Sequence, residues 1–486
     1  MTKQELERGM MSRTENNETA MRRNLSRRHI QMIGLGGAIG TGLFLGSAGI
    51  LKSAGPAAIV GFAIAGIVAF WIMRQLGEML VDEPVSASLS HFSNKYCGSF
   101  FGYLAGWNCA AMYILVGMAE LTAIGKYINY WYPDIPLWMS ASVFFIFINL
   151  VNLLNVRVFG EMEFVFSLVK VVAIVLMIGF GVYILVAGTE PSASVSNLWS
   201  HGGFMPNGVN GLLMALPFIM FAFGGLEMVG FTAGEAKNPE TTIPRAINQV
   251  LLRIAIFYIG AFLVLLSLTP WDELVQSLSS AGDPYSASPF VRSLNLLGSD
   301  NAANLLNFVV LIAALSVYNG VVYCSTRQIH GLAVQGKASA KLLKLNSNNI
   351  PINALGLTAV VTVITVAINF AYPHGTFEML MALAVAANIV NWVLISVTHL
   401  VFRRKLAQVQ KKSVFASPFY PITNYLCILF LLGIMVIMAT MPSVSMSVYM
   451  CPVWIAVLYV FYRRNASHHR PLAPIAPDTN LMDKKA

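Results

Sequence analysis

Runs of about 20 apolar residues, long enough for a helix to cross the hydrocarbon layer of a bilayer, recur along the whole chain. Within that layer only helices and closed barrels satisfy their own backbone hydrogen bonds. Hydrophobic residues make up 56% of the sequence and charged residues only 11%, which excludes an ordinary soluble domain. The sequence therefore predicts an all-α integral membrane protein with about twelve transmembrane helices.

The predicted spans divide the chain into five parts. A tail at 1–29 precedes a first group of five spans at 30–187, and an outer loop with five further spans occupies 188–402. Two more spans at 403–462 and a tail at 463–486 complete the chain. The expected spans cover about 30–50, 57–80, 101–128, 137–156, a fifth that begins after a polar turn at 155–163 and ends near 186, 211–233, 250–268, 304–328, 354–371, 377–402, 425–441 and 444–462. The last two are expected to serve packing or oligomer contacts.

Two of these spans are poor helices. Six glycines fall within the thirteen residues of Gly34–Gly46, and each destabilises a helix interior by roughly 1 kcal/mol relative to alanine. A second interruption, Phe221–Glu227, follows five spans later. Because an odd offset inverts the orientation, the pair predicts two inverted five-helix repeats, spans 1 to 5 and 6 to 10, with broken helices 1 and 6 around a midplane site.

The breaks suggest the chemistry of that site. The N-terminus of a half-helix suits a carboxylate, whereas unwound carbonyls suit a cation or an ammonium group. A zwitterionic amino acid satisfies both, so we assign Gly40, Thr41 and Gly42 to its carboxylate, and the carbonyls near Phe221 and Gly224 to its amine. The alternative is that these glycines only permit close helix packing.

Three ionisable residues lie within predicted spans, where charge is expensive and usually functional: Glu120, Lys170 and Glu227. A desolvated lysine that releases and regains a proton is a plausible coupling group, although Lys170 could instead extend to the cytoplasmic interface. Glu120 shares a helical face with Tyr113, seven residues away. Glu227 adjoins the second break, where bracing the backbone and carrying a proton are both open.

The charges indicate the topology. The net charge of +9 does not form a nucleic-acid-binding patch, because the basic residues lie in the N-terminal tail and in alternate loops. Only Lys52, Lys126 and Arg292 fall clearly on the other side. We therefore expect both termini in the cytoplasm and a first span that is not a cleaved signal peptide.

Two nucleotide-binding motifs nearly match this sequence, but each lacks one glycine that the motif requires. The segment 34–39 has isoleucine where a dinucleotide fingerprint needs its third glycine, and Leu51 stands where a phosphate-binding loop needs glycine. The five cysteines lack metal-ligand spacing, and no His, Cys and carboxylate cluster has catalytic spacing. We expect a transporter rather than an enzyme, with no metal and no cofactor.

Several motifs in order resemble those of bacterial amino acid permeases of the amino acid-polyamine-organocation superfamily, in particular the aromatic amino acid permeases of enteric bacteria. The resemblance extends almost end to end. The residues that carry it are 28–31 (Arg-His-Ile-Gln), 36–46, 73–79 (Met-Arg-Gln-Leu-Gly-Glu-Met), 117–122 (Gly-Met-Ala-Glu-Leu-Thr), 159–164 (Phe-Gly-Glu-Met-Glu-Phe), 223–227 (Phe-Gly-Gly-Leu-Glu) and 314–319 (Ala-Leu-Ser-Val-Tyr-Asn).

This resemblance implies twelve spans with two inverted repeats and proton-driven uptake of an amino acid. It implies that Lys170 occupies the place where sodium-coupled members bind their ion. It also implies that Gly40, Thr41 and Gly42 bind the carboxylate of the substrate. Phe221, Phe223 and Gly224 are implied to bind its amine and its side chain.

Span 3 departs from the family pattern. Enteric aromatic permeases usually continue Gly-Trp-Asn with Tyr-Trp, whereas here Cys109, Ala110 and Ala111 follow. Tyr113 keeps an aromatic ring on this wall. We expect proton-coupled symport of phenylalanine, tyrosine and tryptophan across a bacterial inner membrane. A permease or exchanger for other neutral or small amino acids, and a receptor that does not transport, are the alternatives.

Overall fold

The computed structural model describes residues 39–85, 87–154, 156–228, 230, 239–280, 283, 285–372 and 375–464. Within these residues the regular secondary structure is helical, apart from one isolated bridge between Leu345 and Pro351. Ten helical segments are long and apolar enough to cross a membrane, and Leu137–Asn152 is a shorter apolar helix. The predicted fold class is therefore confirmed.

The first group of spans has bounds close to those expected. The segment Thr41–Asp82 contains two spans, because the backbone turns at Gly55, whose φ is +55°. Residues 30–38 of the first predicted span lie outside the described residues. The helices of this group are α3 (Thr41–Phe44), α4 (Ser47–Ala54), α5 (Ala58–Asp82), α7 (Ser99–Asn129), α8 (Leu137–Asn152) and α9 (Val156–Ala187).

The second group is less regular. Its sixth span is α11 (Gly208–Ala222) followed by a 3-10 turn (Leu226–Met228), and residues 231–233 of the prediction lie outside the described residues. A π-helical segment (Ile254–Gly260) interrupts the seventh span. The remaining helices are α14 (Val250–Arg253), α15 (Ala261–Leu268), α18 (Asp300–Val334), α19 (Ile352–Thr362), α20 (Ile364–Ala371), α21 (Thr376–Gln408), α22 (Ile422–Thr440) and α23 (Ser445–Arg464).

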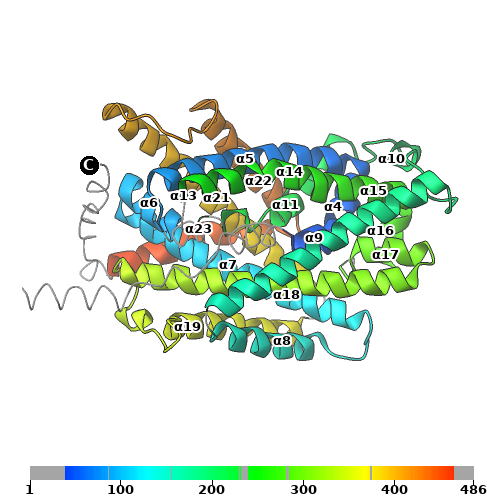
Figure 1. Cartoon of the computed structure of the whole chain (residues 1–486), viewed down its shortest axis with the longest axis horizontal. Coiled ribbons are helices and arrows are strands. Elements are labelled where there is room, and N and C mark those ends of the chain that lie inside the picture. The colour runs from blue at the N-terminus through cyan, green and yellow to red at the C-terminus, as the bar shows by residue number, and fades with distance from the viewer. Residues whose placement is uncertain are drawn as a thin grey trace, which may run out of the picture.

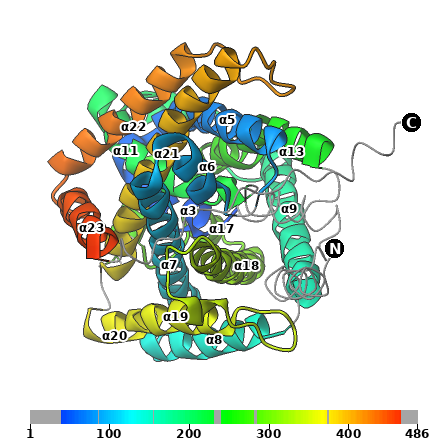
Figure 2. The same cartoon turned by 90° about the vertical axis from the view of Figure 1, so that its left-hand side faces the viewer.

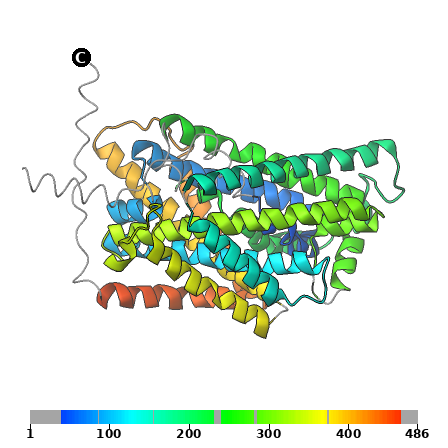
Figure 3. The same cartoon turned by 60° about the horizontal axis from the view of Figure 1, so that its bottom comes forward.

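The long helices run roughly along one direction, which is horizontal in Figure 1 and keeps this course in the view of Figure 3. Viewed from one end, α7 and α18 lie near the middle, and α8, α19, α20 and α23 lie toward the outside (Figure 2). The two central helices pack directly on each other and, together with α21, are the most buried spans. By contrast, α9 and α23 expose many apolar side chains, as lipid-facing helices do.

Four helices of 8 to 10 residues outside the spans were not predicted, because a search for long apolar runs detects only membrane-spanning segments. At the end of the molecule that contains α21's C-terminus lie α6 (Ser88–Cys97) and α13 (Pro239–Asn248), and at the opposite end lie α16 (Trp271–Ser279) and α17 (Pro289–Leu296) (Figure 1). They cover the two ends of the helical bundle.

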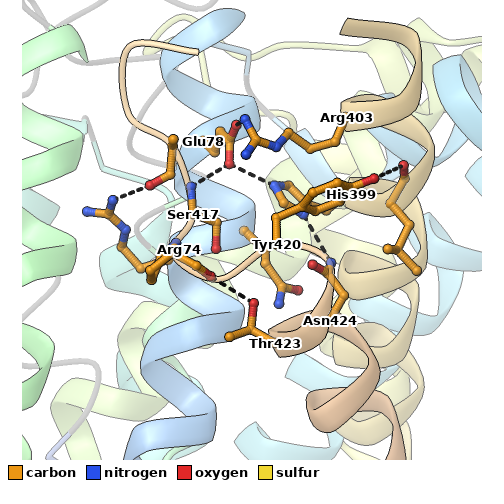
Figure 4. A network of polar contacts seen from close by, with 12 residues as sticks. Arg74, Glu78, His399, Arg403, Ser417, Tyr420, Thr423 and Asn424 are labelled. Carbon is orange, nitrogen blue, oxygen red and sulfur yellow. Dashed lines mark hydrogen bonds and ion pairs between the residues drawn. The ribbon is translucent and has the colours of Figure 1, made fainter. Parts of the chain in front are cut away.

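A buried ionic network ties α5 to α21 and to the segment before α22 (Figure 4). The fully buried Glu78 carboxylate lies 2.9 Å from both His399 Nε2 and Arg403 Nη1, and it accepts a 2.6 Å hydrogen bond from the Ser417 backbone N–H. Arg74 donates to the Ala416 carbonyl. These contacts fix the connection between spans 10 and 11 at the end that the charge pattern predicts to be cytoplasmic.

Candidate functional site

The two predicted breaks are present and lie against each other. Gly40 is extended and precedes α3, while α11 ends at Ala222. A Cβ atom on Gly42 would lie 2.5 Å from the Ala222 Cα atom and 2.9 Å from its nitrogen. Only glycine permits this approach of one backbone to another. The glycine-rich sequence therefore brings the two interrupted spans together.

The first break is also tied to span 3. Thr41 Oγ1 donates a 2.8 Å hydrogen bond to Glu120 Oε1, and both residues are buried. The same carboxylate oxygen lies 3.2 Å from the position of a Cβ atom on Gly40. A negative group at this place is favoured by the positive end of the helix dipole. Glu120 thus contacts two of the three residues assigned to the substrate carboxylate.

Lys170 of α9 is fully buried, so the alternative in which it extends to the interface is wrong. Its ammonium group interacts electrostatically with the carboxylates of Glu163 and Glu120. The structure thus places one cation and two carboxylates in a single buried cluster. This cluster reaches the first break through the Glu120 hydrogen bond to Thr41.

Glu163 was missing from the residues that the sequence singled out. It is buried and accepts a 2.5 Å hydrogen bond from Ser316 Oγ of α18. The prediction placed Glu163 in a polar turn, but α9 already begins at Val156. The available signal was the seven-residue spacing to Lys170, which puts both side chains on one helical face.

The second break has its own supports. The Phe221 carbonyl accepts a 3.0 Å hydrogen bond from the Gly224 N–H, and the Ala222 carbonyl accepts one of 2.8 Å from the Tyr258 hydroxyl. Gly225 has a φ of +97°, and its N–H donates to Glu227 Oε1 at 3.3 Å. Sequence reasoning missed Tyr258, which belongs to the π-helical segment. An apolar run does not reveal such a segment.

Tyr113 of α7 is buried on the wall that faces this second break. Its hydroxyl and the Cys109 thiol both interact with the Glu227 carboxylate, which also lies beside Trp392. Ala110 packs elsewhere, with Ile329 and Ala354. Of Cys109 and Ala110 at the departure in span 3, the structure therefore places Cys109 beside the second break.

The two phenylalanines of the second break have different surroundings. The Phe221 ring meets Phe377 of α21 edge to face, with centroids 6.0 Å apart. The Phe223 ring is fully buried between Phe62 and Tyr258, at 6.0 and 5.1 Å. The assignment of a substrate side-chain role to Phe223 finds no support in this packing, because its ring belongs to the core between spans 2 and 7.

The arrangement can bind a small molecule that carries opposite charges and can hold a proton nearby. Within the part of the chain that the structure describes, no group of three or more His, Cys, Asp or Glu side chains is placed to hold a metal ion. The residues brought together here offer backbone N–H and carbonyl groups, hydroxyls, carboxylates and the buried amine of Lys170.

Comparison with known proteins gives a consistent result. The family model for amino acid permeases matches residues 29–474. The aromatic amino acid transport protein AroP of Escherichia coli K12 is 53% identical over 443 residues, which cover 91% of this chain and 95% of AroP. AroP of Salmonella typhi is 52% identical, and the match again covers 91% of this chain and 95% of AroP. An uncharacterized transporter of Bacillus subtilis, YdgF, is 39% identical to this chain. The match covers 94% of this chain and 99% of YdgF.

Proposed function

The chain belongs to the amino acid permease family, and we propose that it imports aromatic amino acids together with protons across a bacterial inner membrane. It is a multi-pass membrane transporter and not an enzyme. The substrate class is proposed from the name of the AroP relatives and from the aromatic and apolar side chains around the two breaks.

The backbone geometry supports binding of a zwitterion. Half-helix ends at Thr41 and Ala222 lie against each other, so one small molecule can meet both N–H groups and unwound carbonyls. We assign the substrate carboxylate to Gly40, Thr41 and Gly42. The amine is assigned to the carbonyls at Phe221 and Gly224, and the side chain to the wall that contains Tyr113 and Cys109.

The observation that carries the coupling proposal is the connection from Thr41 through Glu120 to Lys170. With all three side chains ionised, Lys170, Glu163 and Glu120 have one positive and two negative charges. A net charge in a buried, low-dielectric place is unfavourable, so binding one proton stabilises the cluster. Because Glu120 also holds Thr41, a change in its charge alters the carboxylate-binding end of span 1.

Uptake by the purified protein in liposomes tests this proposal. With an acidic outside and no internal amino acid, labelled phenylalanine is expected to accumulate above its external concentration, and a protonophore is expected to abolish the accumulation. Uptake only into liposomes preloaded with an amino acid would instead establish exchange. Binding without any uptake would establish a receptor.

Competition defines the substrate. Tyrosine and tryptophan are expected to suppress phenylalanine uptake, whereas charged amino acids leave it unchanged. Cys109, a small side chain on the wall beside Tyr113, is the one specific feature that favours other neutral amino acids. Stronger competition by leucine or alanine than by tyrosine would overturn the aromatic preference and leave the permease function in place.

A further inference from the structure

A cavity of about 350 Å³ lies at the outer end of the bundle, apart from the site at the two breaks. The second half of span 1, the beginning of α11, the beginning of α21 and the loop before α17 line this cavity. Its volume falls in the range of about 300–1,000 Å³ that is typical of pockets for small ligands.

The cavity contains one charge of each sign. Lys52 of α4 is exposed and Glu378 of α21 is half-buried, and both line the wall. Among the described residues, neither side chain forms a salt bridge. The acidic neighbour Asp283 is already paired with Lys126 of α7. An ammonium and a carboxylate therefore face the same cavity, each open to a ligand of opposite charge.

The rest of the lining suits an apolar or aromatic side chain. Met214 and Phe218 of α11 and Met441 contribute apolar surface, and methionine sulfur makes favourable contacts with aromatic rings. The polar residues Ser53, Asn207 and Asn210 lie at the same wall. Complementary charges beside a flexible apolar surface match the chemistry of a free amino acid with a large neutral side chain.

The floor of the cavity closes it off from the breaks. Tyr285 and Phe218 pack on Gly49 so tightly that a Cβ atom there would lie 2.6 Å from the Tyr285 hydroxyl and 2.9 Å from the Phe218 ring. The Tyr285 ring is tilted against the Phe377 ring, with centroids 5.3 Å apart, and Phe377 in turn contacts Phe221 edge to face. Three aromatic rings thus connect the cavity floor to the second break, while the cavity itself stays available on the outer side.

We propose that this cavity is a second, outer binding site for the transported amino acid, in which Lys52 binds its carboxylate, Glu378 binds its ammonium group and the Met214–Phe218 surface holds its side chain. The proposal rests on the proposed function, because it takes the same zwitterion as ligand. Since the Tyr285–Phe377 floor separates the two sites, one substrate molecule at the outer site does not block binding of another at the breaks. Opening of the floor then passes the substrate from the outer site to the breaks.

Equilibrium binding of labelled phenylalanine to the full chain in lipid nanodiscs tests the outer site. The unaltered protein is expected to bind two molecules per chain, one more weakly than the other. The double variant Lys52→Gln/Glu378→Gln is expected to bind one, and its uptake KM should rise about fivefold at unchanged maximal rate, as loss of an exposed charge contact predicts. Matched controls are Arg292→Gln and Glu273→Gln, outer charges that do not line the cavity.

The central site is removed separately by Gly42→Ala, or by Gly40→Ala if the first variant does not fold. One weakly bound molecule that survives this change and disappears in the double variant supports the outer site. A stoichiometry of one that is lost in Gly42→Ala and unaffected by the double variant overturns it. A stoichiometry of one that only the double variant abolishes supports the outer site and overturns the proposed central one.

Discussion

A methyl group added to Gly42 would lie 2.5 Å from the Ala222 Cα atom, so the broken ends of spans 1 and 6 touch backbone to backbone. Their contact involves residues 180 positions apart in the chain. At this contact neither half-helix can move closer to the other, and a larger side chain at Gly42 has to separate them. The first prediction concerns this contact.

Gly42→Ala is expected to abolish phenylalanine uptake, because the new Cβ atom must push the two breaks apart. Real Cβ atoms do not approach other backbone atoms this closely, so the backbone has to shift. Gly433→Ala in α22 is the matched control, since nothing lies within 4 Å of its Cβ position. Initial uptake rates in liposomes, at equal amounts of folded protein, measure the effect. Full activity of Gly42→Ala would contradict the contact.

Lys170→Ala is expected to lose proton-driven accumulation while retaining equilibrium exchange of labelled for unlabelled substrate. The cation is buried with Glu163 and Glu120, and its loss removes the group that neutralises them. The measurement compares uptake under a pH gradient with counterflow in preloaded liposomes. Lys412→Ala, which removes an exposed cation, is the control. Undiminished uphill uptake by Lys170→Ala would exclude the coupling role.

Glu163→Gln is expected to shift the pH profile of uptake to lower pH by about one unit. Glutamine keeps a partner for the Ser316 hydroxyl but removes one of the two negative charges near Lys170. The remaining pair is already neutral, so a higher proton concentration is needed to protonate it. Glu161→Gln, at a half-buried position on the same helix, is the control. An unchanged profile in Glu163→Gln would show that this carboxylate only braces α18.

Glu78→Ala is expected to lower the stability of the protein by about 3 kcal/mol, because Arg403 and His399 then face a buried gap without their shared carboxylate. Thermal unfolding in nanodiscs, followed by tryptophan fluorescence, provides the measurement. Glu240→Ala at an exposed position serves for comparison. Equal unfolding temperatures for the two variants would contradict a stabilising role of the network in Figure 4.

Lys337→Met is expected to stabilise the protein at neutral and acidic pH by roughly 1–3 kcal/mol. Lys337 follows α18, is buried, and its Nζ has no hydrogen-bond partner among the described residues. Burial lowers its pKa from 10.5 to about 7.

The pH dependence of this gain is the diagnostic measurement. Below pH 7 the lysine is charged in both the folded and the unfolded chain, so its burial penalty is complete. The penalty declines as the pH rises from 7 toward 10.5, because the folded chain then holds the neutral amine. The difference in unfolding temperature between the two proteins should therefore shrink between pH 7 and 9.5. A difference that is constant over this range would contradict a desolvated amine.

The sequence predicted the helical segments well because each one is a local property. Spans such as α5, α7 and α21 begin and end within a few residues of the expected positions, apart from the ends that continue into polar loops. Hydropathy summed over about 20 residues is enough to find them. The short helices α6 and α13 lack such a run and were missed.

The candidate site was predicted in part. Thr41, Tyr113, Glu120 and Lys170, which the sequence singled out for substrate binding or proton coupling, are all buried, and their roles stay predictions. Glu163 was misplaced by an error in the start of span 5. The Phe223 ring points into the core between Phe62 and Tyr258, a direction that the break itself does not indicate.

By itself, the sequence determined the membrane class of this protein, the positions of its spans and the two glycine-rich interruptions, because composition over one helix decides each of them. Only the tertiary structure decided that Gly42 contacts Ala222. It also decided that Lys170 is buried beside Glu163 and Glu120, and that Lys52 and Glu378 line one cavity. Such contacts depend on how each helix is rotated about its axis. A shift of one residue turns a side chain by about 100°, and only the packing of all the spans together fixes that rotation.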